Sequence, residues 1–66
     1  MSGETLISLN EVCRRTSLSR TQINVYRSQN RFPKAVPLGF KRIAFVASEV
    51  DGWIAARVAE RDQEAA

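Results

Sequence analysis

Residues 18–33 combine many hydrogen-bonding side chains with few apolar ones. Asn pairs in bidentate fashion with adenine and Arg with guanine, and valine methyls contact the methyl group of thymine. At about 100° per residue, Ile23, Tyr26 and the stem of Arg27 share the packed side of a helix, and the polar residues face away. The pattern therefore predicts a DNA-contacting set, against the alternative of an ordinary solvated surface: Ser19, Arg20, Thr21, Asn24, Val25, Arg27 and Ser28.

A second basic group follows this helix in a different structural context. Two prolines between residues 32 and 38 exclude a helix there, and residues 39–42 are typical of a turn. Pairing of residues 36–38 with 42–45 predicts a two-stranded hairpin, or wing, with Lys41 and Arg42 at its tip. We expect Lys34, Lys41 and Arg42 to contact the phosphate backbone or the adjacent minor groove. The alternative is a charged turn that only keeps the hairpin soluble.

The distribution of charge is more informative than the net charge of +3. Residues 1–46 carry eight Arg or Lys and two Glu, a net charge of +6, whereas residues 47–66 carry two Arg and five acidic residues, a net charge of −3. A basic body favours a polyanionic partner, although chance clustering on a solvated surface is the alternative. With no His, one Cys and no phosphate-binding glycine loop, the composition argues against an enzyme and against a metal or cofactor site.

Two further segments must position the candidate helix. Asn10 is the expected N-cap of a first helix over residues 11–16, which buries Val12 and Cys13 and points Arg14 and Arg15 outward. A turn too short for antiparallel helices follows, with Leu18 packed in the corner. The second helix has a capping box, Ser19 with Gln22, and ends at Asn30, a residue that tolerates the left-handed conformation. This order predicts a helix-turn-helix.

The rest of the chain supplies the core. Ser48 is the expected N-cap of a last helix, whose buried stripe is Val50, Trp53, Ile54 and Val58. The hairpin is expected to pack on the helices through Phe32, Leu38, Ile43 and Phe45. Residues 6–9 either form a brief strand or pack under the first helix.

These elements define the expected architecture. The predicted fold is mainly α with a small β-hairpin: a winged helix-turn-helix of three helices and a two-stranded wing over residues 6–61, with flexible ends at 1–5 and 62–66. Sixty-six residues make one domain, and no apolar run is long enough to span a membrane. Without a signal peptide, we expect a cytoplasmic, nucleoid-associated protein.

Four segments resemble the AlpA family of prophage regulators: residues 17–23 (SLSRTQI), 31–34 (RFPK), 38–39 (LG) and 48–54 (SEVDGWI). The likeness extends from about Leu6 to Arg61. It implies a small winged-helix protein related to the MerR DNA-binding domain and to phage excisionases. Such proteins regulate prophage promoters or direct recombination, which implies double-stranded DNA, an integrase or RNA polymerase, and further copies of the chain on DNA as partners.

The chain also departs from the family's pattern. Ser17 stands where Gly is usual, so the turn is expected to form without a freely left-handed residue, and Asn30 also replaces a common Gly. Residues 24–26 (Asn-Val-Tyr) replace a typical Tyr-Arg-Leu, so a relative's target site does not transfer. Val46 stands where Arg is frequent, which removes one expected phosphate contact.

The sequence favours a sequence-specific, double-stranded DNA-binding regulator. The alternative is an excisionase, or recombination directionality factor, which would bind in tandem, bend attachment-site DNA and recruit an integrase. A protein-interaction module, such as an anti-repressor that uses the acidic last helix, fits the basic body less well. No heptad run supplies a dimerisation helix, so we expect adjacent copies on DNA rather than a stable free dimer.

Overall fold

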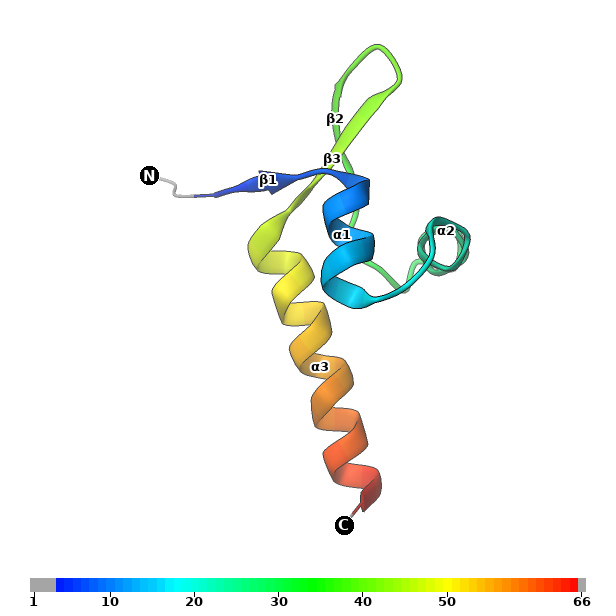
Figure 1. Ribbon diagram of the computed structural model, residues 1–66, viewed down its shortest axis with the longest axis vertical. Coiled ribbons are helices and arrows are strands. Elements are labelled where there is room, and N and C mark those ends of the chain that lie inside the picture. The colour runs from blue at the N-terminus through cyan, green and yellow to red at the C-terminus, as the bar shows by residue number, and fades with distance from the viewer. Residues whose placement is uncertain (1–3, 66) are drawn as a thin grey trace.

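The computed structural model describes residues 4–65, which form three helices and three short strands. In chain order the elements are β1 (Leu6–Ile7), α1 (Leu9–Thr16), α2 (Arg20–Ser28), β2 (Val36–Gly39), β3 (Arg42–Val46) and α3 (Ala47–Ala65). The β2–β3 hairpin and α3 extend toward opposite ends of the long axis, with α1 and α2 between them (Figure 1). The order and types of these elements confirm the predicted helix-turn-helix with a hairpin wing.

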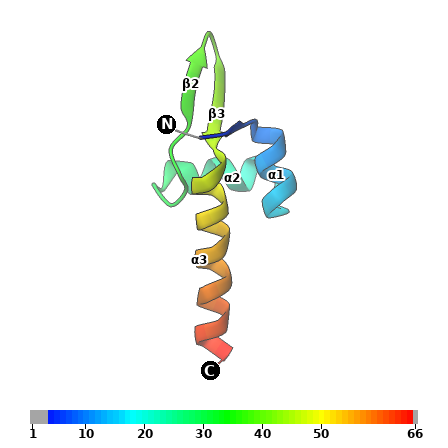
Figure 2. The same cartoon turned by 90° about the vertical axis from the view of Figure 1, so that its left-hand side faces the viewer.

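The corner between α1 and α2 forms through local hydrogen bonds. Ser8, not Asn10, is the N-cap of α1, and its hydroxyl accepts a hydrogen bond from the Glu11 backbone N–H at 3.1 Å. The expectation for Ser17 was also wrong, because Ser17 itself is left-handed at φ 62° and its N–H donates to the Cys13 carbonyl at 2.8 Å. Leu18 then packs partly buried in the corner as predicted, and α2 runs across the direction of α1 (Figure 2).

Both ends of α2 match the sequence analysis. The Ser19 hydroxyl accepts from the Gln22 N–H at 3.1 Å, and the Gln22 side chain accepts from the Ser19 N–H at 3.2 Å, which completes the capping box. At the other end Asn30 is left-handed at φ 58°. The following Arg31 N–H donates to the Tyr26 carbonyl at 2.8 Å, so the chain turns sharply away from the helix.

The sheet is larger than the predicted hairpin. β3 pairs antiparallel with β2 on one side and with β1 on the other, in the order β1-β3-β2. Leu6 lies opposite Val46, so the brief strand that was one alternative for residues 6–9 forms over residues 6–7, whereas Leu9 begins α1. The Ala47 N–H donates to the Thr5 carbonyl at 2.7 Å, and this bond continues the β1 pairing to the start of α3.

A small core joins the sheet to the helices. Its buried members are Ile7, Val12, Ile23, Phe32, Phe45, Ala47 and Val50, and Cys13 packs against them half-buried. Phe32 contacts Phe45 and Trp53 edge to face, with ring centroids 5.7 and 4.9 Å apart. Leu38 is 51% exposed, so the prediction that it packs on the helices was wrong, because its part of β2 extends beyond the body.

The last helix differs from its prediction at its start and along its stripe. α3 begins at Ala47, so Ser48 is not its N-cap; the Ser48 hydroxyl instead donates to Glu4 Oε1 at 3.1 Å. Val50 is fully buried and Trp53 and Ile54 are half-buried, but Val58 is 44% exposed. The helix leaves the body before it reaches Val58. Residues 62–65 continue as helix, and their predicted flexibility stays a prediction, as it does at 1–5, of which 1–3 lie outside the described residues.

Two valines of α3 provide a matched test of this core. Val50→Ala leaves a cavity at a site with no exposed surface, so we expect it to reduce the free energy of unfolding by roughly 2 kcal/mol. Val58→Ala removes the same atoms from a position that is 44% exposed and can relax, and we expect a loss under about 0.5 kcal/mol. Urea denaturation followed by circular dichroism measures both, and equal losses would show that α3 packs differently.

Candidate nucleic-acid interface

The outward face of α2 carries the side chains that the sequence singles out. Ile23 is fully buried beneath the helix, and Tyr26 and Arg27 are half-buried at its sides. The remaining candidates on α2 are exposed: Arg20, Thr21, Asn24, Val25 and Ser28. The helix therefore presents them together on a surface open to a ligand. Thr21 and Val25, with Gln22, Tyr26 and Gln29, also line a shallow hollow of about 320 Å³.

Arg20 is held at the start of α2 by a residue from α1. Its Nη2 donates a hydrogen bond to Asn10 Oδ1, which joins the two helices across the turn. The sequence analysis missed this role, because it assigned Asn10 to the N-cap that Ser8 provides. No periodicity signals a contact between residues ten apart on two helices. The bond fixes the direction in which the Arg20 guanidinium leaves the helix.

Asn24 and Arg27 form a pair on the same helix. Arg27 Nη1 donates to Asn24 Oδ1 at 3.1 Å, and the Arg27 Cζ lies 5.6 Å from the ring centroid of buried Phe45. Bidentate pairing with adenine requires the amide oxygen of Asn as well as its NH₂ group. The bond from Arg27 takes one of the two lone pairs of this oxygen, so adenine must use the other lone pair or displace Arg27. Ser28 is also engaged, since its hydroxyl donates to the Val25 carbonyl at 2.7 Å.

A basic recess adjoins the end of α2. It has a volume of about 230 Å³ and is lined by Arg27, Asn30, Phe32, Pro33, Lys34 and Ala35. Two of these side chains are cations and one is an amide, all suited to a phosphate oxygen. Lys34, which the sequence placed only as a flank of the wing, thus lies beside α2 as well.

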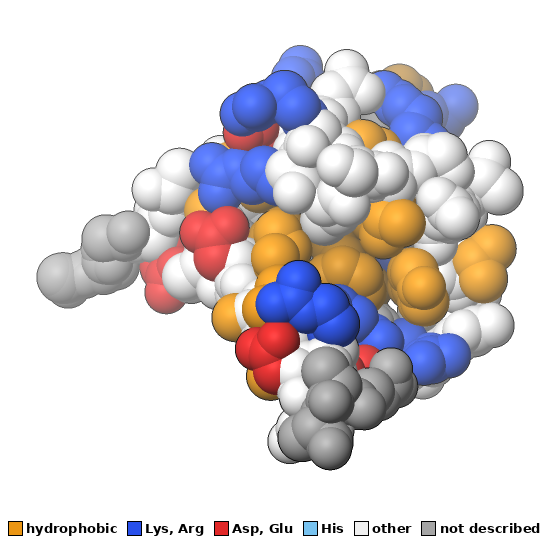
Figure 3. All heavy atoms as spheres, turned by 60° about the horizontal axis from the view of Figure 1, so that its bottom comes forward, with side chains coloured by type: hydrophobic (Ala, Val, Ile, Leu, Met, Phe, Trp, Pro, Cys, Tyr) orange, Lys and Arg blue, Asp and Glu red, His pale blue; other side chains and the backbone are white. Residues whose placement is uncertain are grey.

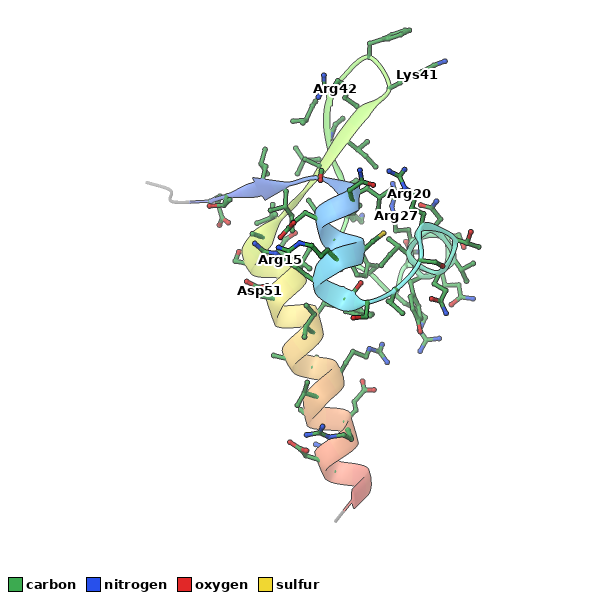
Figure 4. All side chains as sticks on the ribbon, viewed as in Figure 1. Arg15, Arg20, Arg27, Lys41, Arg42 and Asp51 are labelled. Carbon is green, nitrogen blue, oxygen red and sulfur yellow. The ribbon has the colours of Figure 1, made fainter. Side chains whose placement is uncertain are left out.

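The tip of the wing is basic, as expected. Lys41 lies in the connection between β2 and β3 at φ 56°, and Arg42 begins β3. Arg20 and Arg27 lie in the space between α2 and the hairpin, and Lys41 projects from the hairpin end (Figure 4). Arg42 projects from the other side of the hairpin, so the basic side chains of the wing point in different directions (Figure 4).

Ion pairing sorts the cations into two groups. Glu11 bonds both Arg14 and Arg15, at 2.5 and 2.9 Å, and Arg15 also bonds Asp51 at 3.2 Å. These hydrogen bonds lower the pKa of Glu11 to about 2 and raise the pKa of both arginines. Among the side chains of residues 4–63, six cations form no salt bridge: Arg20, Arg27, Arg31, Lys34, Lys41 and Arg42. The uncompensated charge thus lies on α2, the loop after it and the wing.

A different surface is apolar. A hollow of about 270 Å³ lies between the α1–α2 turn and α3, lined by Arg15, Thr16, Leu18, Tyr26, Trp53, Ile54, Arg57 and Val58. Hydrophobic side chains gather on this side of the molecule, with basic groups around them (Figure 3). Tyr26 and Trp53, which the sequence places in the core, therefore also contribute to the surface.

Two further findings concern the part of the chain that the structure describes. It contains no group of three or more His, Cys, Asp or Glu side chains suited to hold a metal ion. None of its helices is both long and apolar enough to cross a membrane.

Two crossed helices joined by a tight turn, followed by a basic hairpin, define a winged helix-turn-helix protein. The sequence model of the family described as "Prophage CP4-57 regulatory protein (AlpA)" matches residues 5–58, and the chain belongs to this family of phage regulatory proteins. It is also 38% identical over 61 residues to "Uncharacterized protein ORF88" of Enterobacteria phage P4, a match that covers 92% of this chain and 69% of the relative. No solved structure was found to match the chain.

The carboxylate of Glu11, in the first turn of α1, predicts that stability depends on pH. Because the folded-state pKa of Glu11 is about 2, below its ordinary value of 4.5, the unfolded chain binds more protons between these values. Glu11 therefore contributes stability that is fully present above about pH 4.5 and is lost as pH falls toward 2. We expect the difference in free energy of unfolding between the wild type and Glu11→Gln to shrink across this window, as measured by urea denaturation.

A double-mutant cycle provides the control for this prediction. In an Arg14→Gln, Arg15→Gln background the partners that lower the pKa are gone, so Glu11→Gln should no longer produce a pH-dependent difference. The same difference in both backgrounds would contradict the assigned cause.

Proposed function

We propose that this protein is a phage-type regulator that binds double-stranded DNA in a sequence-specific manner, with α2 in the major groove and the wing on the backbone or in the adjacent minor groove. The observation that carries this proposal is that, among the side chains of residues 4–63, the six cations without a salt bridge all lie on α2, the loop after it and the wing. A polyanion neutralises such a group, and a helix fits the major groove. The regulatory family supports the same role.

The parts of the interface have separate tasks in this proposal. Arg20 and Asn24 contact base edges, and Thr21 and Val25 complete the surface between them. Arg27 and Lys34, in the recess, and Lys41 and Arg42, on the wing, bind phosphates and set the orientation of α2. The Ser19 and Ser28 hydroxyls already bond within the protein, so a phosphate contact from either is an additional bond.

Regulation of transcription and excision both require this DNA surface. As a transcriptional regulator the protein would act with RNA polymerase, and as an excisionase it would recruit an integrase to a bent attachment site. Neighbouring copies on DNA serve either role, because one recognition helix covers few base pairs. In both roles the protein works where the DNA lies, in the cytoplasm of the host at the nucleoid. The anti-repressor alternative gives no role to the five cations to which this proposal assigns DNA contacts.

Base contacts are tested by two substitutions on α2. On a site selected from random DNA, we expect Arg20→Ala and Asn24→Ala each to weaken binding by about 1–3 kcal/mol and to relax the preference for bases beneath α2. Fluorescence anisotropy with the selected site and single-base variants measures both effects. Asn10→Ala is the matched control, since it removes the bond to Arg20 but keeps the guanidinium. Unchanged affinity and preference in both α2 variants would refute the proposal.

Phosphate contacts have a different signature. We expect Lys41→Ala and Arg42→Ala to weaken binding to selected and random DNA alike, and each lost contact should reduce the slope of log K against log salt by about 0.9. Titrations at several salt concentrations measure this slope. Arg61→Ala is the control, because Arg61 is equally basic but pairs with Asp62 near the far end of α3. An equal change of slope in Arg61→Ala would show only an effect of net charge.

A further inference from the structure

The most exposed large apolar side chain of the described residues is at the tip of the wing. Phe40 is 87% exposed, whereas the other exposed large apolar side chains, such as Val25 and Leu38, are 44–51% exposed. Phe40 is absent from the core and from the residues that pack against it. Its ring lies 5.6 Å from Lys41 Nζ, at the edge of cation–π range. Phe40 therefore contributes nothing to the packing of the fold.

The backbone around Phe40 holds an unusual turn. Gly39, before it, has φ 127°, and Lys41, after it, is left-handed at φ 56°. Gly, Asn or Asp normally occupies a left-handed turn position, so Lys41 adopts this conformation against its own preference. The hairpin tip therefore combines a phenylalanine exposed to water with a neighbouring lysine in a disfavoured backbone conformation. Such local conflicts are characteristic of functional positions.

The surroundings of Phe40 restrict what it can meet. Lys41 and Arg42 follow it directly and form no salt bridge among the described residues. The hairpin projects from the body at one end of the long axis, while the acidic α3 extends toward the other (Figure 1). An isolated aromatic ring beside two cations is too small for a protein interface but suits a base step between phosphates. Proteins that bend DNA from the minor groove insert apolar side chains of this kind.

We propose that Phe40 acts as a wedge, which inserts from the minor groove between two neighbouring base pairs, unstacks them and bends the duplex. Lys41 and Arg42 hold the phosphates on either side of the opened step. This inference rests on the proposed DNA binding and adds to it a specific residue, groove and deformation. It also makes flexible pyrimidine–purine steps the preferred sequence under the wing, although no side chain contacts those base edges.

The test compares the wild type with three variants on the selected site. The DNA carries 2-aminopurine at each position in turn, because this base becomes brighter when it is unstacked, and a dye pair at its ends reports bending. We expect the wild type to brighten one step outside the segment covered by α2. Phe40→Ala should abolish the brightening and the bend and weaken binding roughly tenfold, with an unchanged salt slope.

Two further variants separate the wedge from other effects. Phe40→Leu keeps an apolar side chain and should retain most of the brightening, whereas Leu38→Ala removes an exposed apolar side chain below the tip and should change nothing. All variants should melt like the wild type, since neither residue packs in the core. Wild-type binding with no brightened step, or equal brightening in Phe40→Ala, would overturn the wedge but not the DNA binding. Absence of wild-type binding would overturn the proposed function itself.

Discussion

The arrangement of the molecule depends on the contacts that Trp53 makes from α3. Its Nε1–H donates to the Arg31 carbonyl at 2.8 Å, and its ring packs edge to face on Phe32 and on Tyr26. These contacts join the last helix, the loop after α2 and the side of α2. A chain of 66 residues without a disulfide has few other ways to fix three helices. Because α2 meets both Trp53 and the sheet, this cluster sets the angle between α2 and the wing.

Because the chain is so small, single residues both pack in the core and contribute to the candidate surface. Arg27 lies over the ring of buried Phe45 and also bonds Asn24 on the outward face, so one side chain links the core to the candidate surface. Tyr26 packs on Trp53 and lines two hollows. In a larger protein a second layer of residues supports the functional side chains. Here the core residues themselves do so, and substitutions that alter the core also alter the interface.

Patterns along the chain predicted the fold well where interactions are local. The Ser19–Gln22 capping box and the turn at Asn30 depend on residues within one or two turns, and both are confirmed. The caps of the other helices were misplaced because neighbouring residues compete for them. Pairing of β1 with β3 brings the chain to Ser8 and Ala47 in the position to start a helix. The exposure of Leu38 and Val58 depends on how far the packed body of the protein extends along β2 and α3. Periodicity alone cannot predict this.

In the candidate site, too, the sequence predicts which side chains are exposed but not which hydrogen bonds they make. Helical periodicity places Thr21, Asn24 and Val25 outward, and all three are exposed. Periodicity does not predict the hydrogen bonds of this face: Arg20 donates to Asn10, and Arg27 donates to the Asn24 oxygen. The donors and acceptors of this face are therefore already partly engaged within the protein, and any polar ligand must compete with these bonds or add to them. For this reason helical periodicity identifies the polar face, but not the hydrogen-bonding capacity that each of its side chains retains.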